Sequence, residues 1–164
     1  MERRMMSKPE QLWFLNTRVT VRVAAADGAN HMTVLEHEAP YGDSPPLHVH
    51  AEEDEVFHVI AGELRCRVGG REFSLRAGDT VRAPKDVPHT YLVVSPEGAR
   101  FLTVTCVGHF ERLVRALGRP AAHDGLPVAS GAPTPEQATA LADACLAHGI
   151  TLVGPPLVDM HAAP

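Results

Sequence analysis

Short segments in which apolar and polar residues alternate fill most of the first two thirds of the chain. In residues 18–23, three valines alternate with two arginines and a threonine. Because neighbouring side chains of a strand point to opposite faces, this alternation is typical of a strand with one buried face. Gly, Pro and Asp residues interrupt the chain at intervals of about ten residues, and such spacing predicts an all-β sandwich or barrel. The further predicted strands are residues 32–36, 48–50, 55–60, 63–68, 72–75, 80–83, 89–94 and 100–107.

The pattern changes after residue 108. Residues 110–117 have the apolar spacing of a helix, and residues 119–133 form a linker rich in Pro, Gly and Ala. Thr134 and the proline that follows it are a favourable helix start, so a second helix is predicted from there to about His148. The tail, residues 150–157, is apolar, and we expect it to dock on the barrel or on a second subunit.

The length of 164 residues suits one domain with a buried core. We expect a single domain over residues 1–164, with the barrel at about 13–108 and a helical extension and tail at about 109–164. The net charge of -5 argues against nucleic acid or an anionic membrane as the partner. No stretch approaches the ~20 apolar residues of a membrane span, and the N-terminal region has no signal-like apolar run. A cytoplasmic location is therefore expected.

The three cysteines, Cys66, Cys106 and Cys145, are odd in number, widely spaced and without a C-x-x-C pair. A disulfide framework is therefore not predicted, and we expect the protein to lie in a reducing compartment. Cys66 and Cys106 lie in alternating apolar segments, so we expect both to be buried as small apolar side chains.

Two of the ten histidines, His48 and His50, are two residues apart in a predicted strand. Residues i and i+2 of a strand share a face, so both imidazoles can point at one place. The acidic residues 52–55 follow directly and can supply a carboxylate. Two histidines and one carboxylate are the ligand set of many non-haem iron sites, so this stretch is the candidate for metal chemistry.

Alternation alone leaves the choice of carboxylate open. If Glu55 faces inward, Phe57 and Val59 face inward with it, and His58 faces outward. If Asp54 faced inward instead, residues 56, 58 and 60 would line the interior. Both sets contain apolar side chains, so neither assignment is excluded.

Two spaced motifs resemble those of the cupin family. The first is Gly42, five residues, His48-x-His50, four residues, Glu55, six residues and Gly62; the second is Gly78, five residues, Pro84 and then His89. The chain is most similar to bacterial single-domain cupins of the quercetin-dioxygenase-like kind. It departs from the family pattern at Asp86, where glycine is usual, and at Val93, where asparagine is usual. Asp tolerates left-handed backbone geometry better than most residues, so we expect the turn at Asp86 to be kept.

The resemblance implies a cupin double-stranded β-helix, a jelly-roll barrel with the metal inside and short C-terminal helices. It implies that one divalent transition metal ion, either Fe, Ni, Mn, Co or Zn, is bound by His48, His50, Glu55 and His89. It also favours Glu55 as the residue that receives the substrate proton. Phe57, Val59 and Tyr91 are the expected walls of the substrate pocket.

The implied function is that of a metal-dependent oxidoreductase, dioxygenase-like, acting on a small phenolic or enediol-like molecule. The same site is compatible with an isomerase, a decarboxylase, a polyketide-type cyclase or a non-catalytic small-molecule binder, because fold does not determine function. By the same resemblance the chain is expected to form a homodimer.

Three further expectations concern polar residues near the motif. Glu52 and Glu53 are expected in a solvated turn at the barrel mouth. His58 is expected to be a packing or interface residue and not a ligand. His37 is expected at the surface, and the alternative is a position behind the metal ligands.

Overall fold

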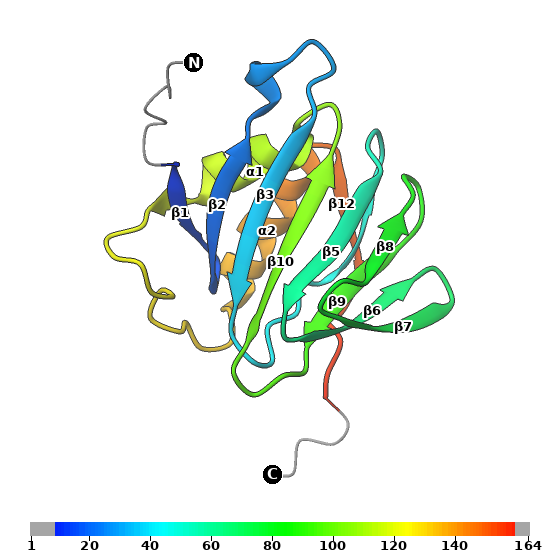
Figure 1. Ribbon diagram of the computed structural model, residues 1–164, viewed down its shortest axis with the longest axis vertical. Helices are drawn as coiled ribbons and strands as arrows, with labels where there is room; N and C mark the ends of the chain where they lie inside the picture. Colours follow the sequence, from blue (N-terminus) through cyan, green and yellow to red (C-terminus); the bar gives the residue numbers. More distant parts are fainter. Residues whose placement is uncertain (1–8, 160–164) are drawn as a thin grey trace, which may run out of the picture.

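Two antiparallel sheets face each other in the computed structural model, which describes residues 9–159 (Figure 1). The seven-stranded sheet has the order β11-β1-β2-β3-β10-β5-β8, and the five-stranded sheet has the order β12-β4-β9-β6-β7. This architecture confirms the predicted all-β jelly-roll fold. The strands are β1 (Gln11–Phe14), β2 (Thr17–Val23), β3 (Thr33–Ala39), β4 (Leu47–His50), β5 (Glu55–Ala61), β6 (Glu63–Val68), β7 (Arg71–Arg76), β8 (Thr80–Ala83), β9 (His89–Val93), β10 (Ala99–Thr105), β11 (Arg119–Pro120) and β12 (Ile150–Gly154).

The turns follow the residue types that the sequence provides. Gly69 has a positive φ of 59° in the β6–β7 hairpin, a conformation that glycine adopts without steric cost. Asp86 has a φ of 63°, so the left-handed turn expected there is kept without glycine.

Two α-helices, α1 (His109–Leu117) and α2 (Pro135–Ala147), lie behind β1, β2 and β3 in Figure 1, and a short 3-10 helix, η1, spans Ala25–Asp27. The start of α2 is the predicted one: Thr134 accepts a hydrogen bond from the backbone N–H of Gln137 and completes a capping box. Helix α1 packs on β1, and α2 packs on β12. The helices thereby close one side of the barrel. The buried cluster they share with the strands contains Leu12, Phe14, Val19, Leu35, Leu113, Val114, Cys145 and Ile150.

The apolar tail docks on the barrel as strand β12. It pairs with β4, with Ile150 opposite His50 and Leu152 opposite His48. The tail is therefore the neighbour of the strand that carries the two histidines.

Strand β10 turns its more polar face inward. Phe101, Thr103 and Thr105 are buried, with at most 2% of each side chain exposed. Cys106 is exposed, so its predicted burial is wrong, whereas Cys66 is buried as predicted. The reason is hydrogen bonding: the Thr105 hydroxyl pairs with that of Thr33 at 2.8 Å, which makes the threonine face the one that fits the interior.

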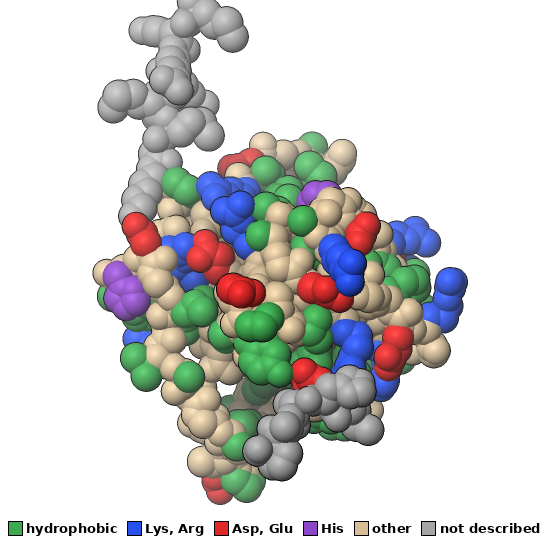
Figure 2. Space-filling model, turned by 60° about the horizontal axis from the view of Figure 1, so that its bottom comes forward, with side chains coloured by type: hydrophobic (Ala, Val, Ile, Leu, Met, Phe, Trp, Pro, Cys, Tyr) green, Lys and Arg blue, Asp and Glu red, His purple; other side chains and the backbone are tan. Residues whose placement is uncertain are grey.

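The surface shows acidic and basic side chains interspersed on the face drawn in Figure 2, without a field of one sign. Within residues 9–159, no helix is long and apolar enough to cross a membrane. Residues 1–8 and 160–164, which the predicted domain includes, lie outside the part that the structure describes.

Candidate metal centre

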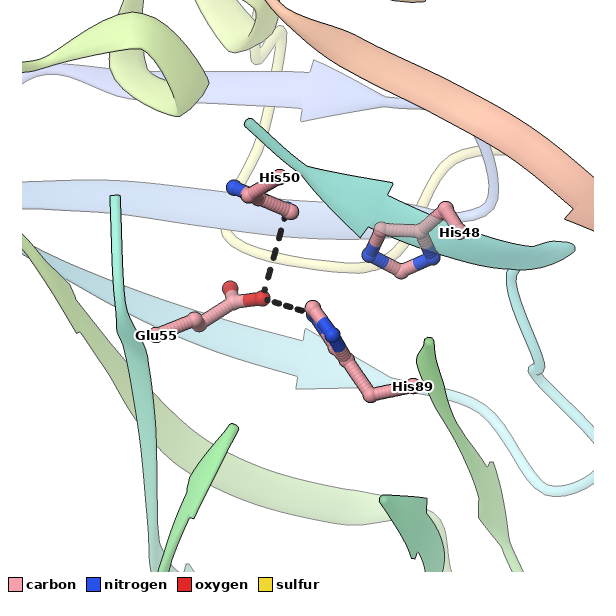
Figure 3. A group of neighbouring side chains, drawn as sticks. All are labelled: His48, His50, Glu55 and His89. Atoms are coloured by element: carbon pink, nitrogen blue, oxygen red, sulfur yellow. Dashed lines mark hydrogen bonds and ion pairs between the residues drawn. The ribbon is translucent and has the colours of Figure 1, made fainter. Parts of the chain in front are cut away.

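Four side chains from three strands converge between the sheets (Figure 3). Strand β4 carries His48 and His50, β5 begins with Glu55, and β9 begins with His89. The register places His48 directly opposite His89. One nitrogen or oxygen atom from each of the four residues lies within 4.8 Å of the others. The structure thus brings together all four residues predicted as metal ligands, and places Asp54 outside the group.

The cluster is tight, and three of its four residues are buried, whereas His48 is half-buried. Oε2 of Glu55 lies 3.1 Å from Nε2 of His89 and 3.6 Å from Nε2 of His50. His50 and His89 are each 1% exposed, and Glu55 is 2% exposed. Water therefore has little access to these polar atoms from the side of the sheets.

The outer nitrogen of each histidine is already engaged. Nδ1 of His48 donates to the Pro46 carbonyl at 2.7 Å, and Nδ1 of His89 donates to the Val87 carbonyl at 2.9 Å. Carbonyl oxygens only accept, so these ring nitrogens must carry the proton. Nδ1 of His50 points in the same way at the Glu53 carboxylate, at 3.2 Å. In the neutral rings, each Nε2 is therefore an acceptor.

Three imidazole lone pairs and a carboxylate consequently face one another with no proton donor among them. Nε2 of His50 is buried and has no hydrogen-bond partner among the described residues. Buried acceptors without a donor are costly, and a divalent cation would satisfy all four. Nitrogen and oxygen ligands of this type suit first-row transition metals. The residues present therefore fit a metal ion.

For His48 and Glu55, the surroundings favour the protonation states that bind metal. Burial, together with the neighbouring His89, lowers the pKa of His48 to about 4, which leaves its ring neutral at neutral pH. Burial of Glu55 opposes its ionisation, but the close contact with His89 and the nearby His50 and His48 outweigh the burial and lower the pKa of Glu55 to about 2. Neutral imidazole and ionised carboxylate are the ligand forms of these groups.

Glu53 is not in a solvated turn, and that expectation is wrong. It is 2% exposed, whereas Glu52 beside it has a largely exposed side chain, as expected. The Glu53 carboxylate accepts from Nδ1 of His50 and from the backbone N–H groups of His109 and Phe110, at 3.3 and 2.8 Å, where α1 begins. A carboxylate at a helix N-terminus is stabilised by the orphan N–H groups and the helix dipole. Glu53 thus links the orientation of His50 to the position of α1.

Replacing Glu53 by glutamine is expected to lower the affinity for Zn²⁺ about tenfold, because outer partners of ligand histidines typically contribute that much. The amide cannot accept from His50 and from both helix N–H groups at once. Calorimetric titration with Zn²⁺ measures the change. Glu52→Gln is the matched control and should leave the affinity unchanged; equal affinities in the wild type and Glu53→Gln would contradict the orienting role.

A cavity of about 140 Å³ opens beside the cluster. Phe57 and Tyr91 line it, as predicted for pocket walls, whereas Val59 is fully buried in the packed core and is not part of the lining. The other wall residues are mostly apolar and come from β1, α1, α2 and β12; they include Phe14, Phe110, Leu113, Leu141, Ile150 and Leu152.

His37 and Asp43 are polar wall residues that were not predicted as such from the sequence. His37 is 3% exposed, so its predicted surface position is wrong. It stacks between Phe101 and Phe110, pairs with the Thr103 hydroxyl at 3.0 Å, and burial lowers its pKa to about 4. Asp43 is the second, and it accepts a hydrogen bond from the Tyr91 hydroxyl at 2.8 Å.

His58 lies on the opposite face of β5 from Glu55. Its Nδ1 pairs with the Thr80 hydroxyl at 2.8 Å. It is therefore outside the cluster, in agreement with the expectation that it is not a ligand.

The fold is an antiparallel jelly roll, and a histidine–glutamate cluster lies beside an apolar cavity inside it. These features are those of a β-barrel protein that can bind a metal ion. Residues 34–105 match the family model described as the cupin domain. Residues 34–105 therefore resemble a cupin domain, and the match supports a protein of the cupin superfamily.

Individual relatives show how far the similarity reaches. The chain is 33% identical over 82 residues to quercetin 2,3-dioxygenase of Bacillus subtilis, a match that covers 50% of this chain and 24% of that protein. The chain thus spans about a quarter of the length of this relative. The polyketide cyclase RemF of Streptomyces resistomycificus superposes with a TM-score of 0.53 and 22% identity, over 65% of this chain and 80% of that one. A predicted oxalate decarboxylase of Thermotoga maritima superposes with a TM-score of 0.55 and 20% identity, over 65% of this chain and 97% of that one. At these identities the two structures establish the fold alone.

Proposed function

We propose that the protein is a metal-dependent oxidoreductase, dioxygenase-like, that acts on a small phenolic or enediol-like molecule. The observation that carries this proposal is the convergence of three histidine acceptors and one carboxylate at the wall of an apolar cavity. The similarity to a quercetin 2,3-dioxygenase supports the dioxygenase type over the other reactions that this fold hosts.

His48, His50, Glu55 and His89 would hold one divalent transition metal ion, which is Fe, Ni, Mn, Co or Zn. Such an ion would supply Lewis acidity toward a substrate hydroxyl and, if redox-active, electron transfer with O₂. The chain contributes the geometry: the backbone carbonyls of Pro46 and Val87 hold two of the rings with Nε2 toward the centre.

Glu55 is the proposed acceptor of the substrate proton. Its carboxylate is ionised and lies at the cavity wall, and the described residues offer no other ionised carboxylate within the cluster. Phe57 and Phe110 present ring faces and edges that orient a planar substrate and exclude water from the reacting group. The reaction therefore needs no base from outside the four residues.

Residues 1–164 are proposed to form one cupin domain that associates as a homodimer. The two sheets and both helices share buried clusters, which supports a single folding unit. Size-exclusion chromatography with light scattering measures the assembly, and a monomeric mass at micromolar concentration would contradict the dimer.

Oxygen uptake by protein loaded in turn with each of the five metals tests the activity. The expected result is consumption of one O₂ per molecule converted for at least one member of a panel of catechols and flavonols. Conversion without oxygen uptake would indicate an isomerase, a decarboxylase or a cyclase instead. Metal-loaded protein that binds panel members and converts none would show a non-catalytic binder.

A further inference from the structure

The size of the cavity restricts what it can hold. Its volume is about 140 Å³, and an apolar cavity of about 150 Å³ takes up a single benzene ring. A one-ring molecule therefore fits the cavity, whereas a flavonol would have to extend out of it.

Most polar side chains of the cavity wall have their hydrogen bonds within the chain. His37 pairs with Thr103 at 3.0 Å. The Thr17 hydroxyl donates to the Phe14 carbonyl at 2.8 Å, and Oγ of Ser44 accepts from the backbone N–H of Leu157 at 3.0 Å. Each of these groups already has a partner within the chain.

Asp43 differs from them. Oδ2 of its carboxylate accepts from the Tyr91 hydroxyl, but Oδ1 has no hydrogen-bond partner within residues 9–159. The backbone is held in place, because the Val93 N–H donates to the Asp43 carbonyl and the Gly42 N–H donates to the Val93 carbonyl, both at 3.0 Å. A carboxylate oxygen thus stands in a fixed position at the cavity wall, ready to accept from a ligand.

Tyr91, the hydrogen-bond partner of Asp43, lies on the strand that also carries His89 of the cluster. Tyr91 follows His89 by two residues on β9, and both line one interior face. Asp43 lines the same cavity as His48, His50 and Glu55 of the cluster. A ring with two vicinal oxygens at the cluster can therefore direct a further substituent toward Asp43.

We propose that Asp43, oriented by Tyr91, accepts a hydrogen bond from the substrate, so that the cavity selects a one-ring catechol bearing an uncharged hydroxyl substituent. This inference rests on the proposed function, since the catechol oxygens are taken to bind at the cluster. Burial raises the pKa of Asp43 to about 6, so its carboxyl is still charged above neutral pH and disfavours a second carboxylate. The chemical class is thus a neutral hydroxyalkyl catechol and not a catechol carboxylate.

Three probes of similar size separate the hydrogen bond to Asp43 from the repulsion between two carboxylates. They are 3,4-dihydroxybenzyl alcohol, 4-methylcatechol and 3,4-dihydroxybenzoate. Binding is measured by calorimetry at pH 7.5 without oxygen, on full-length protein loaded with Zn²⁺, which has no redox chemistry. The benzyl alcohol is expected to bind about tenfold more tightly than 4-methylcatechol, since a hydrogen bond to a charged group contributes at least that factor. The benzoate is expected to bind the most weakly.

Two substitutions test the residue itself. Asp43→Asn keeps the acceptor for Tyr91 and removes the charge, so the penalty on the benzoate should fall to within about threefold of 4-methylcatechol. Asp43→Leu removes the acceptor, so the advantage of the benzyl alcohol should disappear. Glu97→Gln, an exposed carboxylate outside this cavity, is the control and should keep the wild-type ranking. Thermal melts establish that each variant is folded, and the Asn variant preserves the test if the Leu variant is not.

The outcomes separate this inference from the proposed function. The role of Asp43 would be overturned by any of three results. These are equal binding of the benzyl alcohol and 4-methylcatechol, no binding of any probe, and an unchanged benzoate penalty in Asp43→Asn. If the probes bind in the expected order but the protein consumes no oxygen, the role of Asp43 is supported and the dioxygenase activity is contradicted. If the protein consumes oxygen but binds the three probes equally, the dioxygenase activity is supported and the role of Asp43 is contradicted.

Discussion

Replacing Glu55 by glutamine is expected to lower the affinity of the protein for Zn²⁺ by at least about 100-fold, because loss of a partner one step further from the metal already costs 10–100-fold. Glutamine has nearly the same shape, so the barrel should tolerate it. Its amide oxygen is neutral and cannot balance a cation as the carboxylate does. Competition titration against a chelator of known affinity measures the difference.

The matched control is the neighbouring Asp54→Asn. The Asp54 carboxylate accepts from the Lys85 backbone N–H at 2.9 Å and pairs with Arg82 at 3.3 Å, outside the cluster. We expect its affinity for Zn²⁺ to match that of the wild type. Loss of affinity in Asp54→Asn with retention in Glu55→Gln would mean that the opposite face of β5 points inward and that the ligand assignment is wrong.

Removing the metal is expected to destabilise the folded protein by about 4 kcal/mol relative to a sample with metal at 1,000 times its Kd. For a chain of this size that corresponds to a fall in Tm of roughly 8–16 °C. The physical reason is that three histidine acceptors and a carboxylate remain crowded in the apo protein, with Nε2 of His50 buried and unpaired among the described residues. Thermal unfolding followed by circular dichroism, with and without chelator, measures the shift.

Two histidine variants show whether the shift arises at the cluster. In His48→Ala the difference between loaded and chelated protein should largely disappear. His58→Ala is the control, because its ring lies on the other face of β5 against Thr80, and the difference should persist. A metal-dependent Tm that is equally large in both variants would place the binding site elsewhere.

The local part of this structure was predictable from the sequence. The predicted strand at residues 63–68 coincides with β6, and the glycines after it form the expected hairpin. These elements depend on alternation and turn residues within a few positions of one another, which are visible in a single sequence. Strand parity predicted that His48 and His50 share a face, and the resemblance to cupins implied that Glu55 and His89 join them.

The features that were missed depend on partners far along the chain. Glu53 is buried because α1, more than 50 residues later, places two N–H groups over its carboxylate. His37 is buried because β10 brings Thr103 beside it at a sequence separation of 66 residues. Cys106 was misplaced for a similar reason. The hydroxyl face of β10 points inward, where Thr105 pairs with Thr33, although the opposite face of the strand is more apolar. Asp43 carried no signal beyond its position next to Gly42.

The pairing of β4 with β12 also has a consequence for the order in which the protein matures. Strand β4 meets β9 through the single pair His48 and His89, but it meets β12 along its whole length. On the ribosome, residues 48–89 emerge well before residues 150–154, so a nascent chain holds all four cluster residues while β4 still lacks its main neighbour. Metal loading is therefore expected to follow the release of β12 from the exit tunnel, which makes it a late event in biosynthesis.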